Sequence, residues 1–131
     1  MFPGAVSGLP IDMPTMPQLL RKAGYSAHMV GKWHLGHAQW KQTPVGRGFE
    51  THTGSFLWDL DSYDKSMWQD MYTFYGLDWI DAHENGTFKH KLNMTHATKM
   101  ITDTAIQKMD GHNKVKLFYN CLLYTSDAAD E

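Results

Sequence analysis

The spacing of apolar residues near the N-terminus predicts a short helix. Thr15, with Gln18 three positions later, matches a capping box of the kind that begins a helix. Gly24 matches a left-handed cap that ends one. Between them one helical face is apolar, and we expect it to be buried. The residues of that face are Leu19, Leu20 and Ala23.

The residues after this helix predict a strand that ends in a loop bounded by glycines. Tyr25 to Val30 is a run of aromatic, small and branched residues without proline. Gly31 and Gly36 interrupt it, and between them lie Lys32 and His34. If this loop is extended, side chains two positions apart point the same way, so the amine and the imidazole would act on one anion. The alternative is that both are solvated surface groups.

A second helix and strand are predicted towards the C-terminus. Residues 95–109 place apolar side chains three and four positions apart, and residues 115–119 suit a strand. The apolar face of this helix is expected to consist of Ala97, Met100, Ile101, Ala105 and Met109. Helices and strands in alternation predict an α/β fold, a mostly parallel sheet with flanking helices.

The middle of the chain, roughly residues 58–88, is rich in aromatic residues. It is either an irregular surface insertion held by buried rings or a wall of a substrate pocket, since aromatic faces stack on sugars and aryl groups. The acidic run at residues 59–64 hints at a calcium loop but lacks the required glycine and glutamate, which favours solvated acids. His28, His34 and His37 match no zinc motif, and His28 is most simply a strand residue. We therefore expect no metal site within this chain.

Composition narrows the classes of protein. The chain has 131 residues, a formal net charge of −2 and one cysteine, which suits one domain without an internal disulfide. Its lysines and arginines are scattered and form no basic cluster of the kind that binds nucleic acid. No apolar run is long enough to span a bilayer. Asn85 and Asn93 both begin triplets that fit the N-glycosylation pattern. The paired triplets indicate a protein of the secretory route.

One stretch resembles a known family. Residues 14–54 are similar to the second signature region of the sulfatases, most of all to the arylsulfatase B-type branch. The resemblance is carried by Thr15–Tyr25, by residues 28–36, which end in the letters GKWHLG, and by Pro44, Arg47–Glu50 and Gly54. It is strong to Gly54, thinner to Tyr119 and absent afterwards.

This resemblance implies a fold and a chemistry. The fold would be an incomplete piece of the alkaline-phosphatase-like sulfatase fold. The activity would be that of a sulfuric ester hydrolase, whose formylglycine nucleophile attacks aryl or glycosaminoglycan sulfate esters and whose calcium ligands lie outside this chain. Lys32 and His34 match the family's lysine and histidine that orient the formylglycine hydroxyls, and Trp33 would contact substrate. The parent protein would be lysosomal or secreted, with its signal peptide upstream.

The sequence also departs from the family pattern. No C/S-x-P-x-R motif, from which formylglycine is made, occurs anywhere in it. We therefore expect residues 1–120 to be a partial catalytic domain, inactive alone, and residues 121–131 to be an unrelated, artefactual tail. Two other functions stay open: a metal-dependent phosphatase or phosphodiesterase of the same superfamily, and a non-catalytic glycoprotein module that binds sulfated glycans.

Overall fold

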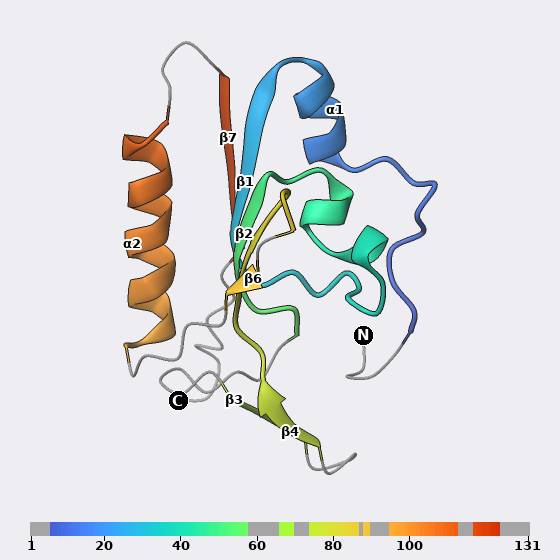
Figure 1. Ribbon diagram of the computed structural model, residues 1–131, viewed down its shortest axis with the longest axis vertical. Coiled ribbons are helices and arrows are strands. Elements are labelled where there is room, and N and C mark those ends of the chain that lie inside the picture. Colours follow the sequence, from blue (N-terminus) through green and yellow to red (C-terminus); the bar gives the residue numbers. More distant parts are fainter. Residues whose placement is uncertain are drawn as a thin grey trace, which may run out of the picture.

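The core of the computed structural model is a mixed sheet (Figure 1), and the described residues are 6–57, 66–69, 74–86, 88–89, 95–112 and 117–123. Its strands follow the order β6-β5-β2-β1-β7. They are β1 (Tyr25–Gly31), β2 (Thr51–Gly54), β5 (Ile80–His83), β6 (Phe88–Lys89) and β7 (Leu117–Leu123). β1 pairs in parallel with both β2 and β7. β5 runs antiparallel to β2, and β6 antiparallel to β5. The predicted α/β class is confirmed, with an antiparallel edge that the helix–strand alternation did not anticipate.

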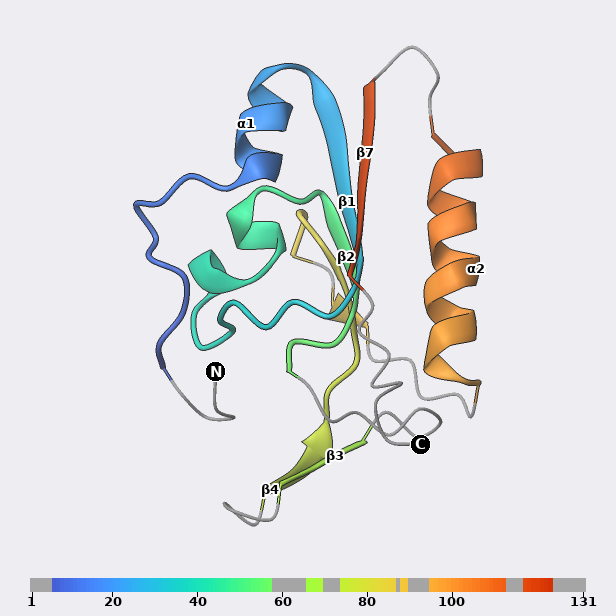
Figure 2. The same cartoon turned by 180° about the vertical axis from the view of Figure 1, so that it is seen from behind.

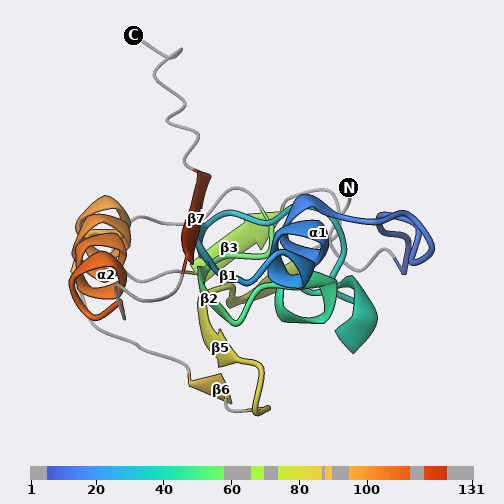
Figure 3. The same ribbon diagram turned by 90° about the horizontal axis from the view of Figure 1, so that it is seen from above.

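Helices lie on both faces of this sheet. Seen from above in Figure 3, α2 (Ala97–Asp110) covers one face, and α1 (Met16–Lys22) lies on the other together with the 3-10 turns η1 (Trp40–Gln42) and η2 (Val45–Arg47). A separate antiparallel pair, β3 (Ser66–Gln69) and β4 (Phe74–Leu77), extends from the lower end in Figure 2. Among the described residues, no helix combines the length and apolar character needed to cross a bilayer.

The ends of α1 are as predicted, but its buried face is not. The Thr15 N–H donates to Oε1 of Gln18 (3.0 Å), and Gly24 follows the helix at φ +91°. Leu19, however, is 52% exposed, and Leu20 and Ala23 are not buried either. The helix has only seven residues and docks through its N-terminal end, where Pro17 is buried. The predicted apolar face is therefore exposed at Leu19 and Ala23 and only half-buried at Leu20.

α2 packs through most of the residues expected. Ala97, Met100, Ile101 and Ala105 form a core cluster with Val30 of β1 and with Trp79. Met109, predicted to belong to this face, is 51% exposed. The last turn of α2 contributes Gln107 and Lys108 to the lining of a groove.

The strand predicted near the C-terminus is present and extends further than predicted. β7 spans Leu117–Leu123, four residues beyond the predicted end, while residues 115–116 of the prediction lie outside the described residues. Cys121 pairs with Met29 of β1, so the strand crosses the boundary expected after residue 120. Residues 124–131 lie outside the described part of the chain. The artefactual origin of the tail stays a prediction.

Candidate functional site

The predicted lysine–histidine loop leaves the sheet where two parallel strands end together. β1 ends at Gly31 and β2 at Gly54. A Cβ at Gly54 would lie 2.1 Å from the Gly31 carbonyl oxygen, so only glycine permits this approach of the two backbones. Open α/β sheets bind ligands at the carboxyl ends of their parallel strands, and Lys32 directly follows such an end.

The backbone of this loop is held by the turn that follows β2. The Trp33 N–H donates to the Ser55 carbonyl (2.9 Å), and the His34 N–H donates to the Phe56 carbonyl (2.8 Å). His34 has φ +57°, a left-handed conformation that is uncommon for a residue with a side chain. The extended loop assumed from the sequence is therefore wrong at His34. The convergence of the Lys32 and His34 side chains stays a prediction.

Trp33 is the anchor of the loop. Its side chain is 5% exposed, and its indole N–H lies within hydrogen-bond distance of the Gly36 carbonyl (2.8 Å) and the Gln42 carbonyl (2.9 Å). Its ring packs edge-on against Phe49, with centroids 6.3 Å apart. Lys32 and His34, on either side of it, are both partly exposed. Trp33 thus fixes the loop from inside, and its contact with substrate stays a prediction.

The arginine–glycine–phenylalanine run of the family resemblance has a structural role beside this loop. Arg47 is 1% exposed, and its guanidinium donates to the carbonyls of Ile11 (2.9 Å) and Met13. The Thr15 hydroxyl in turn donates to the Arg47 carbonyl (2.6 Å). Arg47 therefore connects residues 6–14, here called the N-terminal arm, to the start of α1.

The same arm touches the site loop directly. The Leu9 N–H donates to the Leu35 carbonyl (2.8 Å). A Cβ at Gly36 would lie 2.9 Å from Cα of Gly8, and Gly36 itself has φ +121°. The second glycine of the loop is thus required twice, for its backbone angle and for the close approach of the arm.

Two buried polar side chains that the sequence pattern did not indicate, His52 and Asp78, lie beside the loop. His52 is fully buried, and its Nε2 lies 3.0 Å from the Gly31 carbonyl. Burial, which disfavours the charged imidazolium, lowers the pKa of His52 to about 4. His37, which is half-buried, stacks on Phe56 with centroids 5.9 Å apart. Asp78 accepts hydrogen bonds from the backbone after β2. Nothing in the local sequence pattern distinguishes His52 and Asp78 from solvated side chains.

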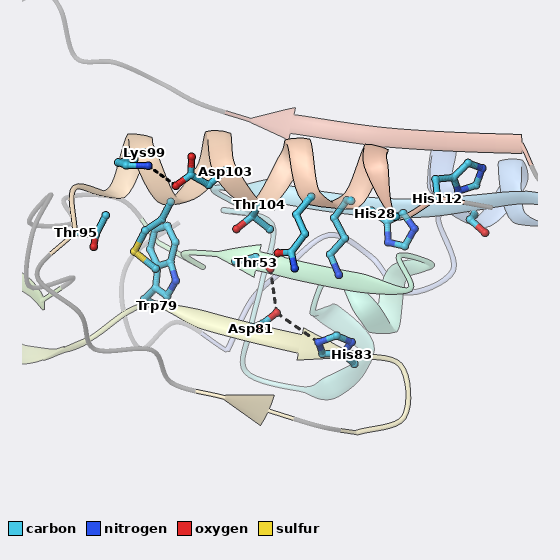
Figure 4. A pocket seen from close by; sticks show the side chains of 15 residues that line it. His28, Thr53, Trp79, Asp81, His83, Thr95, Lys99, Asp103, Thr104 and His112 are labelled. Atoms are coloured by element: carbon cyan, nitrogen blue, oxygen red, sulfur yellow. Dashed lines mark hydrogen bonds and ion pairs between the residues drawn. The ribbon is translucent and has the colours of Figure 1, made fainter. Parts of the chain in front are cut away.

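A groove of about 900 Å³ lies on the other side of the sheet, between α2 and strands β1, β2 and β5 (Figure 4). In it the Thr53 hydroxyl donates to Asp81 (3.0 Å), which also lies 3.5 Å from Nε2 of His83. His28 lines the groove, and Nδ1 of its ring lies 2.9 Å from Oγ1 of Thr51. Burial lowers the pKa of His28. His28 is a strand residue as expected, and the lining of the groove does not include the predicted pair.

The other predictions concerned a metal site, two glycosylation triplets and the aromatic segment. Within the described ranges, no group of three or more His, Cys, Asp or Glu residues is placed to hold a metal ion. Asn85 is exposed in the turn after β5, whereas Asn93 and the acidic run at residues 59–64 lie outside the described residues. Of the aromatic segment, Trp79 is 2% exposed and belongs to the core.

Fold and loop together define a class: an α/β domain that presents a cationic and an imidazole side chain at the carboxyl edge of its parallel strands. The family model described as Sulfatase matches residues 2–127, and the chain belongs to the sulfatase family. It is 35% identical over 117 residues to mouse (Mus musculus) arylsulfatase J, covering 88% of this chain and 19% of that protein. It is 31% identical over 117 residues to an N-acetylglucosamine-6-O-sulfatase of Bacteroides thetaiotaomicron, covering 89% of this chain and 17% of that protein.

Solved structures agree on the fold. A structure described as Ps i-CgsB has a TM-score of 0.76 at 21% identity, covering 95% of this chain and 29% of that one. The structure of BT4656 in complex with its substrate D-glucosamine-2-N,6-O-disulfate has a TM-score of 0.57 at 28% identity, covering 88% of this chain and 19% of that one. The chain thus spans less than a third of these relatives. The predicted family is confirmed, and the activity of the whole protein is a matter for proposal.

Proposed function

We propose that the full-length protein containing this chain hydrolyses sulfate esters, with Lys32 and His34 acting on a formylglycine nucleophile that lies outside this chain. The observation that carries the proposal is the loop of Lys32 and His34 at the carboxyl edge of the parallel strands, within a chain of the sulfatase family. A calcium ion bound by residues outside the chain would neutralise the sulfate oxygens.

Elementary chemistry supports these two roles. A cation that is held in place beside developing negative charge stabilises a transition state without reorganisation, which is worth about 2.7–4 kcal/mol when one such donor is removed. An imidazole exchanges a proton near neutral pH, as the hydroxyl chemistry of a hydrated aldehyde requires. The backbone bonds at Trp33 and His34 limit the movement of the loop, which favours both roles.

The relatives suggest the substrate class. One is named an arylsulfatase and another an N-acetylglucosamine-6-O-sulfatase, and a solved relative is bound to a disulfated glucosamine. We therefore propose aryl or glycosaminoglycan sulfate esters as substrates. The exposed Asn85 and the triplet at Asn93 support a glycosylated, lysosomal or secreted protein.

The test compares sulfate and phosphate esters of the same alcohol. Purified full-length protein should release para-nitrophenol from para-nitrophenyl sulfate and not from para-nitrophenyl phosphate. Turnover of the phosphate alone would instead favour the metal-dependent phosphatase. Binding to immobilised heparin without any turnover would favour the glycan-binding module.

A substitution then ties the activity to this chain. Lys32→Ala should lower kcat/KM for the sulfate ester at least about a hundredfold, because the fixed cation is lost. Lys22→Ala removes an exposed lysine from the last turn of α1 and should leave the rate unchanged. Wild-type activity in Lys32→Ala would remove Lys32 from the site.

A further inference from the structure

Asp78 is a buried carboxylate beside the turn that follows β2. It is 8% exposed. Its Oδ1 accepts from the Phe56 N–H (3.0 Å), and its Oδ2 accepts from the Leu57 N–H (2.7 Å). Two consecutive backbone N–H groups thus point at one carboxylate, and bonds to an ionised acceptor are stronger than neutral ones. Burial raises the pKa of Asp78, and these two bonds oppose that rise.

The same turn holds the site loop from its other side. The carbonyls of Ser55 and Phe56 accept the N–H groups of Trp33 and His34. A continuous path of hydrogen bonds therefore runs from the Asp78 carboxylate through a single residue, Phe56, to the backbone of His34. Since His34 sits in the left-handed region at φ +57°, its conformation depends on such external support.

The Phe56 ring anchors the turn of residues 55–57 in the core. It packs against two core clusters, one containing Met29 and Trp33 and the other containing Val45 and Ile80. With the ring fixed in the core and the amides fixed by Asp78, the Phe56 carbonyl has little freedom to move. A carboxylate is a costly group to bury, and here both of its oxygens are used on the segment that supports the site loop.

We propose that Asp78 is a positioning residue, which fixes the 55–57 turn and through it the backbone of the Lys32–His34 loop. It does not touch substrate. The effect of Asp78 on the reaction rests on the proposed function, whereas its effect on the position of the loop does not. Neither the spacing of Asp78 nor its neighbours in the sequence point to this role.

Asp78→Asn in the full-length protein tests the consequence for turnover. The amide keeps the shape of the carboxylate but turns an NH₂ group towards one of the two N–H donors, so one bond is lost. We expect kcat per folded enzyme to fall tenfold or more, with KM within about twofold, because small displacements of reacting groups are costly. Asp81→Asn, the same change three residues along the chain and on the groove side, should leave both constants unchanged.

Hydrogen exchange measured by mass spectrometry tests the loop independently of activity. In Asp78→Asn, amides of residues 32–36 and 55–57 should exchange about tenfold faster or more, while peptides of α2 stay as in the wild type. Wild-type exchange in those segments, or acceleration spread evenly over the chain, would overturn the proposal. So would a lower melting temperature with unchanged kcat per folded enzyme. A wild-type protein that hydrolyses no sulfate ester would refute the proposed function and leave the exchange result to decide the role of Asp78.

Discussion

The site loop and the α2 side of the sheet are stabilised in different ways. Around the loop, buried polar groups bond to the backbone: the indole of Trp33, the imidazole of His52 and the carboxylate of Asp78 all do so. On the α2 side, a small apolar cluster around Met100 holds the helix, next to a wide polar groove.

This difference bears on function. Hydrogen bonds to backbone groups are directional, so they set the position of a loop as well as its stability. Apolar contacts are not directional and tolerate small shifts. Changes near the loop should therefore affect turnover and stability together, whereas changes under α2 should affect stability alone.

The largest expected effect is that of Trp33→Ala. It removes a buried ring and the N–H bonded to Gly36 and Gln42, so the free energy of unfolding should fall by about 3–5 kcal/mol. Denaturant titration of the full-length protein measures this, and activity should fall with it. Trp40→Ala, at a ring 43% exposed, is the matched control and should cost under about 1 kcal/mol. Equal losses in the two variants would contradict the anchoring role.

The second effect is a pH dependence that originates in His52. Its pKa in the folded protein is about 4, below the ordinary 6.5, so the unfolded chain binds the proton first as the pH falls. The stability that His52 contributes is complete above about pH 6.5 and is lost as the pH falls towards 4. The loss amounts to roughly 3 kcal/mol at about 1.4 kcal/mol per unit of pKa. Melting temperatures of the wild type and His52→Asn, compared between pH 7.5 and pH 4.5, measure it. A difference that stays constant with pH would refute the assignment.

Met100→Ala tests the α2 side of the comparison. The side chain is 9% exposed and belongs to the apolar cluster under the helix, so we expect a loss of about 2 kcal/mol in unfolding free energy. Turnover per folded protein should not change, in contrast to Trp33→Ala. Met109→Ala, at a side chain 51% exposed, should stay within about 0.5 kcal/mol of the wild type. A loss of turnover in Met100→Ala would show that the two regions are coupled.

The smallest effect concerns an exposed ion pair of α2 at the edge of the groove. Nζ of Lys99 lies 2.6 Å from Asp103 one helical turn away, and both side chains are more than half exposed. Lys99→Ala should cost about 0.5 kcal/mol or less, since water and salt screen such pairs. The cost should shrink further in high salt, measured by the same denaturant titration. A larger or salt-independent cost would mean that Lys99 does more than pair with Asp103.

Local features of the sequence determined the parts of this protein that depend on neighbours along the chain. The capping residues Thr15 and Gln18 and the glycine at Gly24 set the ends of α1, because a helix end is satisfied by residues within one turn of it. The strand that begins at Tyr25 and the glycine-bounded loop after it followed in the same way. The sulfatase family was indicated by resemblance of residues 14–54 to a known signature and is confirmed by the family model.

Only the tertiary structure decided which groups meet across long stretches of chain. Arg47 reaches the carbonyl of Ile11, His52 reaches Gly31, and Asp78 reaches the turn at Phe56. The exposure of Leu19 and the left-handed backbone at His34 belong here too. Burial and hydrogen bonding between distant segments depend on how the whole sheet assembles, and no pattern of adjacent residues encodes them.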